Sequence, residues 1–121
     1  MPVVKIDAVD ATQFPGGATY RTVVGEDDGS TPVWIGVQVS PPGYSTGTHS
    51  HPYLEVVSVL EGEGEAWMED SDEVVPIVPG DSLVVPPGVK HWFRAVGAKP
   101  LKTYGVHASS ARIVDRETAG E

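Results

Sequence analysis

Two histidines and a glutamate stand close together in the middle of the chain, at a spacing that suits metal binding. They are His49, His51 and Glu55. Residues i and i+2 of an extended strand point to the same face, so these three side chains would share one face with Tyr53. A carboxylate in an apolar interior needs a partner, and a metal ion supplies one while also binding neutral imidazoles. The plainer alternatives are a histidine satisfied within the core and a solvated loop pair.

A second segment makes the metal interpretation stronger, because it supplies a third imidazole. It reads as a strand, a tight turn at Pro86-Pro87-Gly88 and then His91 at the start of the next strand. Such a turn can deliver His91 to a fixed position at a strand end, where it would complete the set His49, His51, Glu55 and His91. Cysteine is absent, so the ligands are nitrogen and oxygen. They suit one divalent ion of Fe, Mn, Ni, Zn, Co or Cu, and the affinity order alone does not choose among these metals.

The two segments resemble the two motifs of the cupin superfamily. The first motif is matched by Gly43, His49, His51, Glu55 and Gly62, and the second by Gly80, Pro86, Gly88 and His91, each with the family's spacing. The resemblance implies a small double-stranded β-helix, or jelly-roll barrel, with metal ligands at His49, His51, Glu55 and His91. It also implies a homodimer. The one departure is Ala95, where the second motif usually carries Asn, which is not a metal ligand in the family.

The rest of the chain is typical of an all-β protein that could position such a site. Glycine and proline together make up 25 of 121 residues, and short valine-rich runs lie between them. We expect a single domain over residues 1–121, with its core at about 19–107 and both motifs within 43–95. The expected strands are Val3–Val9, 19–24, 33–39, 54–60, 65–68, 73–77, 82–85, 91–96 and 101–107. Residues 115–121 resemble a frayed polar tail.

Charge and hydropathy exclude several classes of function. The net charge of −9 argues against binding to nucleic acid or to an anionic membrane surface, because both need basic residues. No apolar run approaches the roughly 18 residues of a membrane span, and the N-terminus lacks the apolar stretch of a signal peptide. We therefore expect a cytoplasmic protein that binds a small-molecule ligand or substrate.

Other side chains are weaker candidates for the pocket. Tyr53 could transfer a proton if its hydroxyl reached an open metal position, and His107 could be a general base at the barrel mouth. Each has a plainer alternative, which is a packed ring for Tyr53 and a solvated strand-end histidine for His107. The expected pocket residues are Phe93, Gln38, Trp34 and Trp67. Of the arginines, Arg21 and Arg94 are best placed in the sequence to meet an anion, although Arg94 is expected to point outward.

Three functions are compatible with this site. An Fe(II) dioxygenase-like oxidoreductase is favoured, because three histidines and one glutamate stand in an apolar pocket without an obvious acid–base pair. The second is a non-redox metal enzyme, a lyase, isomerase or decarboxylase that depends on a proton-transferring residue. The third is a cupin that binds or senses a small molecule without turnover. The fold does not decide among them.

Overall fold

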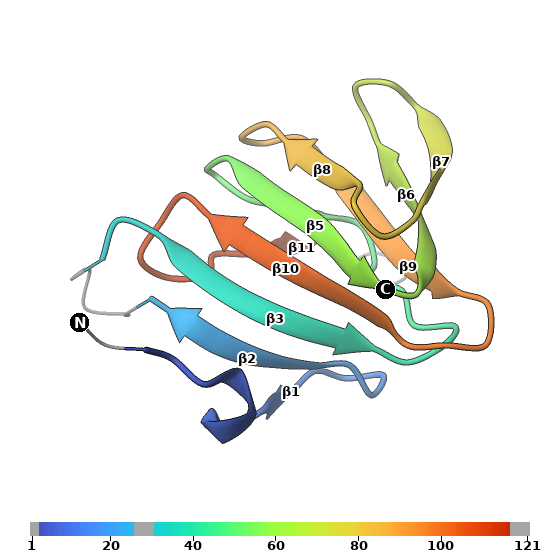
Figure 1. Ribbon diagram of the computed structural model, residues 1–121. Helices are drawn as coiled ribbons and strands as arrows, with labels where there is room; N and C mark the ends of the chain where they lie inside the picture. The colour runs from blue at the N-terminus through green and yellow to red at the C-terminus, as the bar shows by residue number, and fades with distance from the viewer. Residues whose placement is uncertain (1–2, 26–30, 117–121) are drawn as a thin grey trace.

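The computed structural model describes residues 3–25 and 31–116 and is built from short antiparallel strands. The larger sheet has the order β1-β2-β3-β10-β5-β8 and the smaller has the order β11-β4-β9-β6-β7. The strands of the larger sheet are β1 Thr12–Gln13, β2 Thr19–Val24, β3 Trp34–Ser40, β5 Glu55–Glu61, β8 Ser82–Val85 and β10 Leu101–His107. Those of the smaller sheet are β4 His49–Ser50, β6 Glu63–Met68, β7 Glu73–Ile77, β9 His91–Val96 and β11 Asp115–Arg116. Figure 1 shows β9 and β11 passing behind the larger sheet.

The core lies between the two sheets, where alternate residues of facing strands meet. Strand β9 alternates buried and less buried residues from His91 onward, and β8 alternates exposed and buried ones. This is the period of two that a sheet with one covered face requires. The buried cluster draws on both sheets and contains Val57, Val59, Ala66, Ile77, Leu83, Val85, Phe93, Ala95 and Leu101. The predicted all-β jelly-roll architecture is confirmed, and the strand runs lie within two residues of the predicted ones after residue 19.

Two predictions about the ends of the chain are wrong. Residues 3–9 form no strand, because the backbone N–H groups of Ala8 and Val9 turn back to Lys5 and Ile6 and close the short 3₁₀ helix η1 (Ile6–Ala8). The predicted frayed tail begins instead with the short strand β11, which pairs with β4 through Asp115–Ser50 and Arg116–His49. Polarity predicted disorder there, but the edge of the smaller sheet offers the backbone a partner. Residues 117–121 lie outside the described part of the chain.

Within residues 3–25 and 31–116, no helix is long and apolar enough to cross a membrane.

Candidate metal centre

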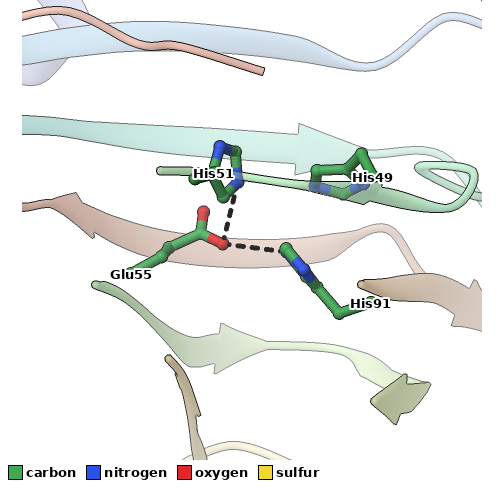
Figure 2. A group of neighbouring side chains, drawn as sticks. All are labelled: His49, His51, Glu55 and His91. Carbon is green, nitrogen blue, oxygen red and sulfur yellow. Dashed lines mark hydrogen bonds and ion pairs between the residues drawn. The ribbon is translucent and has the colours of Figure 1, made fainter. Parts of the chain in front are cut away.

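The chain crosses from the smaller sheet to the larger one between the first and last residues of the His49–Glu55 motif. His49 lies in β4, whose register partner in β9 is His91, while Glu55 opens β5 in the other sheet. Residues 49, 51, 53 and 55 are nevertheless all buried, as predicted for alternate side chains that share one face. The three imidazoles and the carboxylate therefore converge from both sheets on one point (Figure 2).

One ligand atom from each of His49, His51, Glu55 and His91 lies within 4.8 Å of all the others. The Oε1 atom of Glu55 is 3.2 Å from Nε2 of His51 and 3.1 Å from Nε2 of His91. The ring centroids of His49 and His91 are 4.2 Å apart. Such a compact set of nitrogen and oxygen donors is the arrangement that a first-row divalent ion requires.

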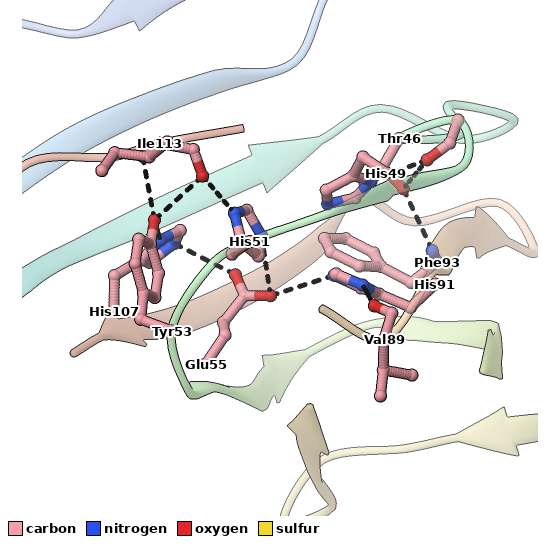
Figure 3. Close-up of polar contacts among 11 residues, drawn as sticks. Thr46, His49, His51, Tyr53, Glu55, Val89, His91, Phe93, His107 and Ile113 are labelled. Atoms are coloured by element: carbon pink, nitrogen blue, oxygen red, sulfur yellow. Dashed lines mark hydrogen bonds and ion pairs between the residues drawn. The ribbon is translucent and has the colours of Figure 1, made fainter. Parts of the chain in front are cut away.

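The three histidines are oriented by hydrogen bonds to backbone carbonyls (Figure 3). Their Nδ1–H groups donate to Gly47 from His49 (2.7 Å), to Ile113 from His51 (2.6 Å) and to Val89 from His91 (3.0 Å). A proton held at Nδ1 leaves the Nε2 lone pair of each neutral ring free to bind a metal. Metal-ligating histidines are typically held in this way, by a carbonyl or carboxylate behind the ring.

The ionisation of these side chains also suits a metal. Burial and the nearby His91 together lower the pKa of His49 to about 3, so this ring is neutral at pH 7. Burial alone would raise the pKa of Glu55. The close contacts of the carboxylate with His107, His51 and His91 outweigh that effect, hold its pKa well below the ordinary value and keep the carboxylate ionised. Neutral imidazoles and an ionised carboxylate are the forms that bind metal.

The local hydrogen bonding fits an ion at this point. Nε2 of His51 is buried without a hydrogen-bond partner, although Oε1 of Glu55 is close by. With the ring proton at Nδ1, both atoms are electron-rich, and two lone pairs face each other across this gap. A cation placed between them satisfies both, so the residues present fit a divalent ion.

His107 and Tyr53 form a hydrogen-bonded chain behind the carboxylate. Nε2 of His107 is 3.0 Å from Oε2 of Glu55, and its Nδ1 is 2.5 Å from the Tyr53 hydroxyl (Figure 3). That hydroxyl accepts a hydrogen bond from the Ile113 N–H (2.9 Å) and lies 3.2 Å from the Ile113 carbonyl. The Tyr53 hydrogen therefore has two acceptors, His107 and Ile113. When it turns to Ile113, Nδ1 of His107 can carry its own proton, so the ring can hold a proton on either nitrogen.

His107 and Tyr53, the two candidate proton carriers, occupy different positions relative to the cavity. His107 is buried and lines the cavity next to the metal ligands, so it is not a solvated strand-end histidine. Tyr53 does not line the cavity, because its hydroxyl is held by His107 and the Ile113 backbone. Tyr53 is therefore positioned to orient His107 rather than to face an open metal position.

A cavity opens from this centre between the sheets and is partly open to solvent. Three of the four expected pocket residues, Trp34, Gln38 and Phe93, line it. The fourth, Trp67, does not. Its ring stacks on Trp92 at 6.5 Å, and its indole N–H donates to Asp72 (2.9 Å). The buried neighbours Gly64 and Ala66 set the opposite parity in β6, which directs Trp67 outward.

Comparison with known proteins places the chain in a family. The family model of the cupin domain matches residues 36–107, which is more than half of the chain. The chain belongs to the cupin family. Among the relatives of this cupin is the polyketide synthase CurC of Streptomyces cyaneus, 29% identical over 78% of this chain and 61% of CurC. Another is the 5-nitrosalicylic acid 1,2-dioxygenase of a Bradyrhizobium species, 31% identical over 73% of this chain but only 46% of that enzyme. Both relatives extend well beyond the matched region.

Among solved structures, the polyketide cyclase RemF of Streptomyces resistomycificus has a similar fold. The TM-score is 0.82 at 24% sequence identity, and the match covers 100% of this chain and 88% of RemF. At this identity the match establishes the shared fold. The curated relatives and this neighbour therefore support the same conclusion, that the whole described chain is organised as a cupin.

The sequence did not predict several of the residues that line the cavity of this cupin. The arginines that line it are Arg112 and Arg116, which follow the last long strand. The two arginines expected to meet an anion lie elsewhere, since Arg21 pairs with Asp7 (3.7 Å) and Arg94 with Glu65 (2.6 Å). The remaining lining residues that were not predicted are Phe14, Tyr20, Gly36, Tyr44, Thr46, Val57, Thr103, Gly105 and Val114. Arg116 falls in the segment predicted to be a frayed tail, and no feature of the sequence singled out Arg112.

Proposed function

We propose that this cupin is a metal-dependent enzyme that closes a ring in an enolisable polyketone by non-redox carbon–carbon bond formation. The observation that carries the proposal is the hydrogen-bonded chain from Glu55 through His107 to Tyr53, which joins the metal-binding set to a proton-carrying group in the cavity. The names of CurC and RemF support a polyketone as the substrate class.

An aldol-type ring closure needs two things from its site. A carbonyl oxygen must be polarised, and a proton must leave a carbon next to a carbonyl and later reach the departing oxygen. A divalent ion held by His49, His51, Glu55 and His91 would supply Lewis acidity toward a carbonyl oxygen. His107 supports the proton steps, because its Nε2 faces Oε2 of Glu55 and the Tyr53 hydroxyl can adjust to either tautomer of the ring.

This proposal differs from the dioxygenase that the sequence favoured. The preference for a dioxygenase depended on the apparent lack of an acid–base pair near the metal ligands. His107 removes that premise. It is buried rather than exposed at a strand end, and its Nε2 lies 3.0 Å from Oε2 of Glu55. The non-redox class, which was expected to need a proton-transferring residue, now has one.

The test uses heptane-2,4,6-trione, a small triketone that can close to 5-methylbenzene-1,3-diol with the loss of one water and no oxidant. Purified protein loaded in turn with Zn, Mn, Ni, Co or Fe is mixed with the triketone under nitrogen, and the product is followed by liquid chromatography. We expect faster ring closure than with the free ion, and a large loss of rate in His107→Gln at unchanged metal content. Ring closure no faster than with the free ion, under every metal, would contradict the proposal.

The metal ligands themselves are tested by elemental analysis. We expect His51→Ala and His91→Ala to lower the metal content per chain, because each removes one Nε2 donor from the set. His107→Gln is the matched control, a histidine substitution in the same cavity outside the proposed ligand set. Unchanged metal content in both alanine variants would refute the ligand assignment.

A second candidate, an Fe(II) dioxygenase, is favoured by one observation, the relationship to 5-nitrosalicylic acid 1,2-dioxygenase. Its signature is oxygen consumption by the Fe(II)-loaded protein in the presence of a 2-hydroxybenzoate, measured with an oxygen electrode. Under this alternative the triketone is inert under nitrogen, so the two assays separate the reactions. Binding of both compounds without turnover would favour the third function, a sensing or binding cupin.

The homodimer and the cytoplasmic location stay predictions. Light scattering after size exclusion measures the mass in solution, for which a homodimer predicts twice the 12.8 kDa of one chain.

A further inference from the structure

We propose that Arg112 forms an anion-binding subsite at the outer wall of the cavity, which selects planar substrates that carry a carboxylate. The inference deepens the proposed function and rests on it, because it names a chemical class for the substrate of the same pocket.

The guanidinium of Arg112 lies among three aromatic rings. Its Cζ is 4.9 Å from the ring centroid of Phe14, 4.7 Å from that of Tyr20 and 5.2 Å from that of Trp34. All three rings and Arg112 line the cavity. A guanidinium packed on ring faces keeps the N–H groups at its edge available, and its planar fork matches the two oxygens of a carboxylate.

Among residues 3–25 and 31–116, no carboxylate forms an ion pair with Arg112, in contrast to the surface arginines. Arg94 and Arg21 each form an ion pair with a carboxylate. Arg116, the other arginine of the wall, donates to the Thr46 carbonyl (2.7 Å). The one buried carboxylate of the cavity, Glu55, already interacts with His51, His91 and His107. Arg112 is thus the cation of the cavity that is best placed to meet an anionic ligand.

The backbone beside Arg112 is fixed to the metal centre. The Ile113 carbonyl accepts the Nδ1–H of His51 (2.6 Å), and the Ile113 N–H donates to the Tyr53 hydroxyl (2.9 Å). Figure 3 shows the Ile113 segment lying across these two side chains. Two residues later the chain pairs with β4. The segment therefore holds Arg112 at a set position relative to the ligand histidines, as a recognition residue for the far end of a substrate requires.

The binding test uses 2-naphthoate and its neutral, nearly isosteric amide, 2-naphthamide, with Zn-loaded protein. Calorimetric titration, supported by the fluorescence of Trp34 in the cavity wall, gives both affinities. We expect the wild type to bind the carboxylate about tenfold or more tightly than the amide, since a hydrogen bond to a charged group contributes that much. Arg112→Gln should bring this ratio close to one, with the amide affinity and the zinc content unchanged.

Arg94→Gln is the matched control, because Arg94 also stacks on a ring, that of Trp92 at 5.1 Å, but outside the cavity. It should keep the wild-type ratio. Arg112→Lys retains the charge without the planar fork and should give an intermediate ratio of the two affinities. This variant replaces Arg112→Gln in the test if Arg112→Gln does not fold. A wild-type ratio near one, or an unchanged ratio in the Arg112 variants, overturns the subsite. If the ratio behaves as expected but the triketone is not cyclised, the proposed function fails and the subsite stands.

Discussion

The floor of the cavity contains two glycines on neighbouring strands, and alanine at these two positions should have opposite effects on stability. Gly36 in β3 is the register partner of Gly105 in β10, and both line the cavity. Both lie in extended strands with ordinary backbone angles, so alanine is sterically possible at each as far as the backbone is concerned. The outcome is decided by what the added Cβ atom would meet.

At Gly36 the added atom would meet the indole of Trp34. It would lie 2.2 Å from Cη2, 2.8 Å from Cζ2 and 2.9 Å from Cζ3, so the ring would have to move. Trp34 is buried and packs edge-on against His107 (5.1 Å) and Tyr20 (5.7 Å), which resist that movement. Overpacking of this kind costs about 1–3 kcal/mol. The lower entropy of the unfolded alanine chain returns about 0.4–1 kcal/mol, so the net loss should be at most about 2.6 kcal/mol.

At Gly105 the nearest atom to the added Cβ is the Gly36 carbonyl oxygen at 4.0 Å, an ordinary contact. The alanine methyl group would project into the cavity without a clash. Only the entropy effect then remains, so Gly105→Ala should raise the free energy of unfolding by about 0.4–1 kcal/mol. Each variant adds one methyl group and gains the same entropy term, so the two free energies of unfolding should differ by the overpacking cost alone, roughly 1–3 kcal/mol.

Urea denaturation of the metal-free proteins, followed by circular dichroism, measures both free energies of unfolding. The slope with denaturant should be the same in all three proteins, which shows that the surface exposed on unfolding is unchanged and that the midpoints report stability. A Gly36→Ala protein as stable as Gly105→Ala would mean that Trp34 does not lie over Gly36, and the account of the cavity wall given above would be wrong.

Further substitutions test other parts of the molecule. Tyr53→Phe should lose about 1–3 kcal/mol of unfolding free energy, because the Ile113 N–H is left without its hydroxyl partner; no loss in urea denaturation would contradict this bond. Leu101→Ala removes a fully buried side chain and should cost about 2–5 kcal/mol, whereas truncation at the exposed Leu60 is the control and should cost much less. Glu65→Gln should change stability by less than about 1 kcal/mol, since its ion pair with Arg94 is largely exposed; a larger loss on thermal unfolding would mean that the pair is better shielded than its exposure indicates.

The candidate metal-binding set could be predicted from the sequence because each half of it is a local motif, and the resemblance to the cupin motifs joined the two halves. His49 and His51 are related by the period of a strand, and a Pro-Pro-Gly turn sets the start of β9 at His91. The face of Trp67 could also have been deduced, because its neighbours Gly64 and Ala66 are the small residues that fit the packed interior of β6.

The roles of His107 and Arg112 could not be predicted in this way. His107 meets Glu55 because β10 pairs with β5 over a separation of 52 residues, and no spacing in the chain encodes that register. Arg112 lies in a polar stretch whose composition is typical of a solvated tail. Its position follows from two long-range interactions, the pairing of β11 with β4 and the hydrogen bonds of Ile113. Both residues are placed by tertiary structure, on which local patterns carry no information.

The crossing of the chain between His51 and Glu55 has a mechanical consequence. Because β5 belongs to one sheet while β4 and β9 belong to the other, an ion held by this set would bridge the two layers of the sandwich. Pulling the layers apart would then require breaking coordination bonds as well as separating apolar surfaces. The ion would cross-link the two sheets. The affinity for the metal would then set how much larger the free energy of unfolding is in the metal-loaded protein than in the metal-free one.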